Sequence, residues 1–431
     1  MLIRFQVANY RSIKEPVELS MVAIDRDRPA VRRQFPLGES LVPVAAIYGP
    51  NASGKSNLLS AFVWLQTAVV VSLRGWTDTI PVDPFAFGSL ASSPTEFELE
   101  MTVDGVRYEY LLEVDANRVL YEALFHYPQK LRKRVFERVG DTTPVIQRGL
   151  GTLAGARDLL TPRTLLLSAA SRSDVPEIRG FASQLVGAMI RGPIPIRAQY
   201  ASRRLVRYSG GHNASTARLF ETSYEPSLFD GDEPSEVRAM DARSQALAML
   251  RMADLGIDDV YVDEEVTPLE DGTKWRRQRI SMMHRVGGAS ERLPYSEESA
   301  GTREWFDLIG PVQEALRRGG VLLADELDAS LHPVLSAHLI KLFHDPATNH
   351  AGAQLVFTAH DTNLMSSLHR DEIWFTQKLE DGSTRLGPLS EFAKTRVRTS
   401  SNLAVGYLNG RFGALPNVDD VALLRSLGLI G

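Results

Sequence analysis

The sequence of 431 residues contains no cysteine, which excludes disulfide bonds, thiolate zinc sites, iron–sulfur clusters and cysteine nucleophiles. It also lacks an excess of positive charge, because 48 lysine and arginine residues stand against 53 acidic residues and leave a formal net charge of −5. Only eight of the basic residues are lysine, and the arginines are scattered along the chain. This balance argues against a protein that coats nucleic acid through bulk charge, although a local basic surface stays open.

A long uninterrupted apolar run is absent as well. Arg4 interrupts the only early apolar segment, which the apolar centre of a secretion signal would not tolerate. The most hydrophobic later stretch, residues 58–73, contains Gln66, Thr67 and two serines, and it is shorter than the roughly 20 apolar residues that a spanning helix needs. We therefore expect a cytoplasmic protein with no membrane partner.

Strand patterns dominate the first third of the chain. Apolar and polar residues alternate on both sides of Asp104 and Gly105, and an Asp-Gly pair between such runs is a strong hairpin signal. Residues 41–48 form a continuous apolar run, which is typical of a strand buried on both faces, and a helix is expected to follow as far as about Leu73. Further strands are expected at residues 2–9, 17–23, 118–127 and 133–139.

The rest of the chain has other patterns. Leucine-rich helical pieces fill much of residues 150–256, around a Gly-, Ser-, Pro- and acid-rich stretch at 208–236 that predicts a long surface loop. Paired strands return at 257–295, and from about residue 302 helices and strands alternate, which predicts a mostly parallel sheet covered on both faces. We therefore expect one α/β domain in two parts, 1–149 with an antiparallel β subdomain and 257–431, separated by a helical insertion at 150–256.

A phosphate loop is the strongest motif of the sequence. Residues 49–56 read GPNASGKS and match the pattern G-x-x-x-x-G-K-[ST] at every defined position, with the buried strand before them and the helix after them. Backbone N–H groups of such a loop bind nucleotide phosphates at the positive end of the helix. Lys55 would place its charge on the β- and γ-phosphates of ATP, and the Ser56 hydroxyl would ligate Mg²⁺. The predicted nucleotide-binding residues of this region are Gly49, Asn51, Ser53, Gly54, Lys55, Ser56 and Asn57.

Two acidic residues, Asp325 and Glu326, follow the apolar run at 321–324. A buried strand would deliver Asp325 at its C-terminal end, where the carboxylate can hold Mg²⁺ beside the phosphate loop. Glu326 can then polarise the attacking water as a general base. His360 follows the next strand and would lie at the same edge of the sheet. We therefore predict Glu326, His360 and Lys55 as catalytic residues of an ATPase, and Ser56 and Asp325 as metal ligands.

The order of these motifs resembles that of the ABC-type ATPases of the RecF, SMC and OLD group. In that group a Ser-x-Gly signature opens a helix ahead of the Asp-Glu strand, and the matching residues here are Ser299 and Gly301. The resemblance also matches Asp328 to an aspartate that contacts the nucleotide site and His360 to the switch histidine. The string NYRSI near the N-terminus is similar to a turn of the same group, which implies that Arg11 touches the nucleotide.

The resemblance narrows to the RloA/AriA-like bacterial ATPases, through the strings NYRSIKE, YGPNASGKSN, ESAGTRE, DELDASLHP, FTAHDTNL and GYLNGRFGALP. It implies an ABC-type P-loop NTPase fold that uses ATP and Mg²⁺. It also implies a homodimer, or a larger ring, in which the signature of one copy closes the nucleotide site of the other. Members of this group resemble sensor or motor subunits that accompany a separate effector, often a nuclease, in defence against phage.

Three other functions compete with a regulatory ATPase: a DNA clamp, a transporter ATPase and a self-contained nuclease. A RecF- or SMC-like ATPase that clamps DNA in repair would need a basic surface, and residues 191–207, with five arginines and no acid, are the best candidate for it. Whether DNA is a ligand therefore stays open. A transporter ATPase is disfavoured, because the region between loop and signature does not resemble a compact helical subdomain. Too few residues follow His360 for a nuclease domain, so we expect any nuclease to be a separate chain. The tail at 394–416 is polar, aromatic and Gly-rich, and we expect partner docking there or on the insertion.

Overall fold

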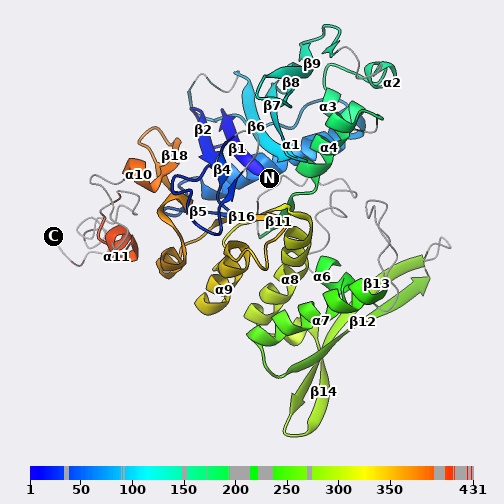
Figure 1. Cartoon of the computed structure of the whole chain (residues 1–431), viewed down its shortest axis with the longest axis vertical. Helices are drawn as coiled ribbons and strands as arrows, with labels where there is room; N and C mark the ends of the chain where they lie inside the picture. The colour runs from blue at the N-terminus through cyan, green and yellow to red at the C-terminus, as the bar shows by residue number, and fades with distance from the viewer. Residues whose placement is uncertain are drawn as a thin grey trace.

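A six-stranded sheet carries the candidate site, in the order β11-β15-β16-β5-β17-β18 (Figure 1). Neighbouring strands are parallel except β18, which runs antiparallel to β17. The bounds are Val44–Tyr48 for β5, Met189–Arg191 for β11, Val321–Ala324 for β15, Gln354–Thr358 for β16, Ile373–Lys378 for β17 and Thr384–Pro388 for β18. The protein is seen here in a computed structural model, which describes residues 1–33, 38–88, 90, 93–147, 153–171, 173–192, 194, 214–221, 236–268, 274–392, 403–410, 412, 425 and 429.

The six-stranded sheet separates two hydrophobic cores. In β5, Ala45 and Ile47 belong to the core around the first long helix, whereas Ala46 and Tyr48 belong to the core around two later helices. Because side chains of a strand alternate between its faces, this division places helices on both sides of the sheet, as the sequence predicts. The helices are α1 (Lys55–Gly75) on one side and α8 (Ala300–Arg318) and α9 (Pro333–His344) on the other.

Helix α1 is unusually apolar. Among the described helices it alone is long and apolar enough to cross a membrane by length and composition, but most of it is buried inside the protein. Its burial against the sheet accounts for its apolar character, because a helix surrounded by core residues needs no polar face.

An antiparallel sheet of seven strands packs on the α1 side of the molecule, in the order β10-β9-β8-β7-β6-β1-β2. Asp104 and Gly105 both adopt left-handed φ angles, 48° and 76°, and close the hairpin that their sequence predicts. The predicted strands of the first third are all present. Their bounds are Leu2–Ala8 for β1, Val17–Ser20 for β2, Thr95–Val103 for β6, Val106–Val114 for β7, Val119–Tyr127 for β8, Lys133–Val139 for β9 and Val145–Ile146 for β10.

The segment 150–256 contains helices, but it also supplies a strand that its sequence pattern does not reveal. β11 pairs in parallel with β15 and becomes the edge of the central sheet. Helices before β11 pack in the core of α1, and helices after it pack in the core of α8. These helices are α2 (Ala154–Arg157), α3 (Leu166–Ala170), α4 (Pro176–Val186), α6 (Ala214–Arg218) and α7 (Glu236–Ala253).

The prediction of a surface loop over residues 208–236 is wrong for residues 214–221, whereas residues 208–213 and 222–235 lie outside the described residues. Helix α6 lies there, and Thr216, Ala217 and Phe220 are buried. The Thr216 hydroxyl donates to the Phe306 carbonyl at 2.7 Å and accepts from the Gly310 N–H at 2.8 Å. Tertiary packing on α8 therefore decides the conformation of α6, although the flanking Gly, Ser and Pro residues are typical of a loop.

A three-stranded antiparallel arm projects from the α8 side of the molecule (Figure 1). It consists of β12 (Ile257–Pro268), β13 (Lys274–Val286) and β14 (Ala289–Pro294), and the 3-10 helix η3 (Tyr295–Glu297) leads from it into α8. Asp271 and Gly272, predicted as the turn between the first two strands, lie outside the described residues. The remaining elements are β3 (Arg32–Arg33), β4 (Ser40–Leu41), η4 (Thr362–Ser367), η5 (Arg370–Glu372), α10 (Leu389–Phe392) and α11 (Leu403–Leu408).

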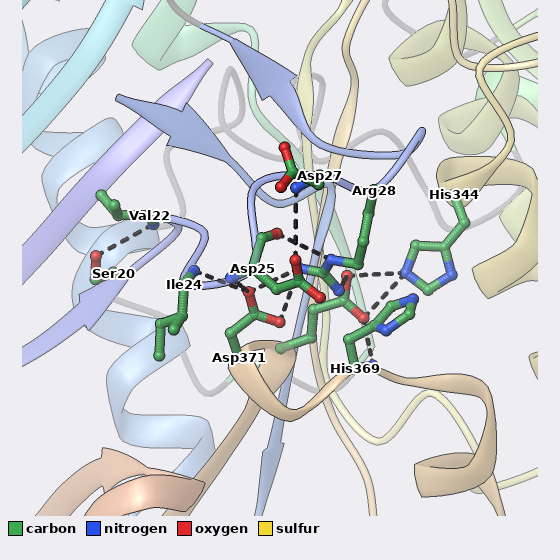
Figure 2. Close-up of polar contacts among 10 residues, drawn as sticks. Ser20, Val22, Ile24, Asp25, Asp27, Arg28, His344, His369 and Asp371 are labelled. Atoms are coloured by element: carbon green, nitrogen blue, oxygen red, sulfur yellow. Dashed lines mark hydrogen bonds and ion pairs between the residues drawn. The ribbon is translucent and has the colours of Figure 1, made fainter. Parts of the chain in front are cut away.

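A buried ionic cluster joins the segment after β2 to the amino ends of the central strands (Figure 2). One guanidinium nitrogen of Arg28 donates to both carboxylate oxygens of Asp371, at 2.7 and 2.8 Å. Another nitrogen of Arg28 lies 3.6 Å from Glu372, whose two oxygens each lie 3.1 Å from Nε2 of His344. The cluster lies at the amino ends of the parallel strands, whereas the residues predicted for the nucleotide site lie at their carboxyl ends.

His369 lies beside this cluster, with its ring centroid 5.8 Å from that of His344. His369 is exposed to solvent, but the partial burial of its ring lowers its pKa, and the charge of Glu372 opposes the shift. The folded protein therefore resists a proton that the unfolded chain takes up near pH 6.5. As the pH falls through that region, the unfolded state binds more protons than the folded state, and the free energy of unfolding decreases.

The variant His369→Gln is expected to lose this component. Between pH 7.5 and 5.5 its melting temperature should fall less steeply than that of the wild type, in thermal unfolding followed by circular dichroism. His350→Gln makes the same change at another exposed histidine, which lies outside this cluster, and serves as the control. Parallel slopes for wild type and His369→Gln would contradict the assignment.

Candidate functional site

The phosphate loop connects the end of β5 to the start of α1. Its backbone uses left-handed φ angles at Ala52 (60°) and at Gly54 (100°), directly before the first residue of the helix. The amine of Lys55 turns back into the loop and donates to the carbonyls of Gly49 at 2.8 Å and Pro50 at 3.1 Å. The loop residues Ser53, Gly54 and Lys55 are buried, whereas Asn51 and Ala52 are exposed. The phosphate loop therefore folds back on itself, and two of its carbonyls bind the amine of Lys55.

Three carboxylates act on the charge of Lys55. Burial lowers the pKa of Lys55, and the negative charges of Asp325, Glu326 and Asp328 oppose that shift. Three acidic residues predicted for the site are thus close enough to act on the lysine of the loop. The structure brings together residues that lie about 270 positions apart in the sequence.

Two threonines support the loop from behind, and sequence reasoning missed both. The hydroxyls of Thr376 in β17 and Ser53 lie 2.6 Å apart, and the hydroxyl of Thr384 in β18 donates to the Ser53 carbonyl at 2.9 Å. A Cβ atom at Gly49 would lie 2.3 Å from Thr376 Oγ1, and one at Gly54 would lie 2.1 Å from Thr384 Oγ1. Glycine is therefore required at both loop positions because the β17–β18 hairpin approaches the backbone closely.

The NYRSI turn also lies against this region. Asn57 donates to the Ser12 hydroxyl at 2.7 Å, and Ser12 in turn lies 2.7 Å from the Thr384 hydroxyl. Arg11 has a left-handed φ of 52°, and its guanidinium donates to Ser60 at 2.9 Å and to Asp83 at 3.4 Å. The turn thus lies next to the loop. The guanidinium of Arg11, predicted to touch the nucleotide, has protein partners here, and Ser12 contacts Thr384 behind the loop.

Asp325 meets the phosphate-loop helix at the carboxyl end of β15. Its side chain is buried, and its Oδ1 accepts from the Ser56 hydroxyl at 3.0 Å and from the Thr358 hydroxyl at 2.6 Å. The Thr358 hydroxyl also accepts from the N–H of Glu326 at 2.7 Å. The two predicted metal ligands are therefore in contact, and Thr358, at the end of β16, positions them. A hydroxyl and a carboxylate are oxygen donors of the kind that Mg²⁺ prefers, so this pair fits the ion.

Glu326 and His360 are both exposed at this edge of the sheet. Glu326 has a left-handed φ of 52°, an uncommon conformation for a residue with a side chain. Asp328 holds the two segments together, because its Oδ2 accepts from the N–H of His360 at 2.8 Å and from the N–H of Asp361. Its other oxygen, Oδ1, is buried without a hydrogen-bond partner among the described residues. Asp328 therefore sets the position of the His360 backbone in this structure.

The signature candidates lie at the start of α8. The Ser299 hydroxyl accepts from the Thr302 N–H at 3.0 Å and caps the helix. A Cβ atom at Gly301 would lie 3.0 Å from the carbonyl of Ser330, in the segment that follows Glu326. Within the described part of the chain, the side-chain hydrogen bonds of Ser299 stay inside α8.

One further group of residues has the composition of a metal site. Ligand atoms of Asp254, His284 and Glu298 lie within 4.8 Å of one another. Nε2 of His284 is 2.7 Å from the carboxylate of Glu298, which is a hydrogen-bond distance. A satisfied polar contact explains this group, and we assign no metal to it.

Residues 191–207, the arginine-rich segment, are the candidate for a basic surface that faces DNA, and Arg191 does not fit that role. Arg191 is buried and pairs with Glu304 and Asp307, so it does not contribute a free positive charge to the surface. Residues 195–207 of that segment lie outside the described residues, as do residues 394–402, 411 and 413–416 of the predicted docking tail.

A family described as "AAA domain, putative AbiEii toxin, Type IV TA system" matches residues 44–366. No curated protein matches the chain. Among solved structures, "Crystal structure of the SmcHead bound to the C-winged helix domain of ScpA" is similar with a TM-score of 0.45 and 12% identity, over 90% of this chain and 97% of that chain. The fold itself is mixed α/β, with a mostly parallel sheet, additional antiparallel sheets and the phosphate loop between β5 and α1, as predicted.

Proposed function

The chain belongs to this AAA domain family, and on that premise we propose that it is a regulatory ATPase. It would form a dimer around ATP and Mg²⁺ and control a separate effector protein, a nuclease or toxin, in defence against phage. The observation that carries the ATPase proposal is the contact between Ser56 and Asp325, with Glu326 as the next residue. This arrangement supplies a phosphate-binding loop, a pair of metal ligands and an exposed carboxylate at one edge of one sheet.

Each residue of the site has a role in this proposal. Lys55 would exchange the carbonyls of Gly49 and Pro50 for phosphate oxygens, while the N–H groups of the loop bind the phosphates. Ser56 and Asp325 would hold Mg²⁺, which neutralises negative charge that develops on the phosphate oxygens. Glu326 would accept a proton from the attacking water as the general base.

The remaining site residues would act around this centre. His360 would orient the attacking water, and Asp328 would keep the His360 backbone in place. The dimer is proposed from the signature at the start of α8, where the N–H groups of a helix N-terminus favour a bound anion. The Ser299 hydroxyl and the side-chain-free Gly301 support a close approach of phosphate to that N-terminus in a second copy.

The variant Ser299→Asp tests the dimer. Aspartate is a good N-cap and keeps an acceptor for the Thr302 N–H, so the helix should remain intact. It also places a negative charge where the γ-phosphate of the other copy would bind. We expect ATP binding to the monomer to be unchanged, while dimer formation weakens by at least about 100-fold because like charges oppose each other. Sedimentation and fluorescent-nucleotide titration measure the two quantities.

The outcomes of this test are distinct. Loss of ATP binding to the monomer would contradict a signature that acts between two copies. If Ser299→Asp still formed the ATP-dependent dimer as well as the wild type does, Ser299 would not lie in the dimer interface.

The effector is proposed from the family description, which mentions a toxin and a toxin–antitoxin system. Purification of the protein with the products of its neighbouring genes, with and without ATP, should recover an effector whose binding depends on the nucleotide. A duplex DNA titration at rising salt serves as the counter-test, since a DNA clamp would show a steep dependence of affinity on salt.

A further inference from the structure

Arg191 is a buried cation with two carboxylate partners on one helix. Its side chain is 8% exposed. Two of its nitrogens donate to the two oxygens of Glu304, at 3.0 and 2.7 Å, and one of them also lies 3.0 Å from Asp307. Both carboxylates belong to the first turns of α8, which Ser299 caps. A guanidinium that binds one carboxylate through two nitrogens fixes the direction as well as the distance of its partner.

The backbone of Arg191 contacts Asp325, the proposed metal ligand at the end of β15. The carbonyl of Arg191 accepts from the N–H of Asp325 at 2.9 Å. The next residue, Gly192, has a left-handed φ of 94°, and a Cβ atom there would lie 2.3 Å from the carbonyl of Asp325. The chain at Arg191 and Gly192 is therefore packed directly onto Asp325, with no room for a side chain between them.

A third contact restrains the same network. Tyr295, in η3, donates its hydroxyl to Asp307 at 2.8 Å, on the oxygen that Arg191 does not use. Asp307 is thereby held between β11 and the residues that lead from the arm into α8. The position of the helix start depends on groups that are all buried or half-buried, where ion pairs are screened little by salt.

We propose that Arg191 is a positioning residue that couples the metal-binding carboxylate to the signature helix of the same chain. Its backbone follows the position of Asp325, and its side chain sets the orientation of α8 through Glu304 and Asp307. A shift of Asp325 when the site fills would thereby alter how Ser299 and Gly301 are presented to a second copy. This inference rests on the proposed function, because it assigns a route between two parts of the proposed ATPase site.

The variant Arg191→Gln removes the charge and keeps part of the side-chain volume. We expect ATP binding to the monomer to remain, because Arg191 touches no phosphate-loop residue through a described contact. We expect kcat to fall at least about tenfold and ATP-dependent dimers to be lost, since the two carboxylates of α8 lose their shared partner. Arg191→Lys, which keeps the charge without the planar two-nitrogen geometry, should lie between wild type and Arg191→Gln.

Arg28→Gln is the matched control. The side chain of Arg28 is 10% exposed and also lies between two carboxylates (Figure 2). Those carboxylates directly precede the amino end of β17, whereas Asp325 follows the carboxyl end of β15. Its loss should lower the melting temperature in the same way and leave kcat unchanged. Glu304→Gln, in which Arg191 keeps Asp307, provides a milder change if Arg191→Gln does not fold, and it should lower kcat with monomer binding intact.

The results separate the inference from the function on which it rests. A wild-type protein that neither hydrolyses ATP nor dimerises with it overturns both. An active wild type, with Arg191→Gln or Glu304→Gln equal to Arg28→Gln in kcat and dimerisation, overturns the inference alone. Loss of monomer binding in Arg191→Gln would also overturn it, because the residue would then support the loop rather than the signature.

Discussion

Replacing Glu326 with glutamine is expected to lower ATP turnover by roughly two to four orders of magnitude, which is the usual contribution of a general base. Glutamine has nearly the same shape and tolerates the left-handed φ of 52° no worse than glutamate does. ATP binding should persist, because Lys55, Ser56 and Asp325 are untouched. With hydrolysis removed, the ATP-bound dimer should accumulate instead of dissociating.

Phosphate release and light scattering after gel filtration in ATP measure these two effects. Glu314→Gln is the matched control, since it makes the same chemical change at a half-exposed glutamate on α8 that pairs with Arg317 and Arg318. Unchanged turnover in Glu326→Gln would assign the role of base to another residue. A monomeric Glu326→Gln protein at saturating ATP would contradict the dimer.

Replacing Gly54 with alanine is expected to abolish nucleotide binding at ordinary ATP concentrations. The φ of 100° is unfavourable for any residue with a Cβ atom, and that atom would lie 2.1 Å from Thr384 Oγ1 and 2.9 Å from Ser12 Oγ. Left-handed strain costs about 1–2 kcal/mol, and the collision adds to it, so we expect ATP affinity to fall by at least about 100-fold. Isothermal titration with ATP and Mg²⁺ measures the change.

Two further variants separate the causes of that loss. Gly105→Ala introduces a side chain at a φ of 76° with nothing within 4 Å, so it should cost stability and leave ATP affinity unaltered. Combining Gly54→Ala with Thr384→Ala removes the nearest collision and should recover part of the binding. If Gly54→Ala bound ATP as well as Gly105→Ala does, close support of the loop by β18 would be refuted.

The phosphate loop and the strands around it could be predicted because their signals are local. The run from Val44 to Ser56 contains a buried strand, a glycine-rich turn and a helix start within 13 residues, and each signal is independent of the rest of the chain. The Asp-Gly hairpin at residue 104 and the apolar strand before Asp325 are local in the same sense. These patterns were sufficient for the α/β fold class.

The residues that sequence reasoning missed depend on distant partners. Thr358, Thr376 and Thr384 are ordinary threonines of strands, and only the order of those strands in the sheet brings them to the loop and to Asp325. Arg191 was grouped with neighbouring arginines because its segment contains no acid, yet its carboxylates lie more than 110 positions later on α8. Sequence patterns are sought over windows of about 11–18 residues, so they cannot reveal contacts between residues more than 100 positions apart.

The support of the loop by β17 and β18 has a consequence for any shortened version of this protein. The stretch that identifies the family ends at residue 366, so it excludes Thr376 and Thr384 and, at the other end, Ser12. A fragment limited to residues 44–366 would keep the whole phosphate-loop sequence. It would lose the three hydroxyl side chains that support the loop. We therefore expect nucleotide binding to require both flanking segments in addition to the residues that the family matches.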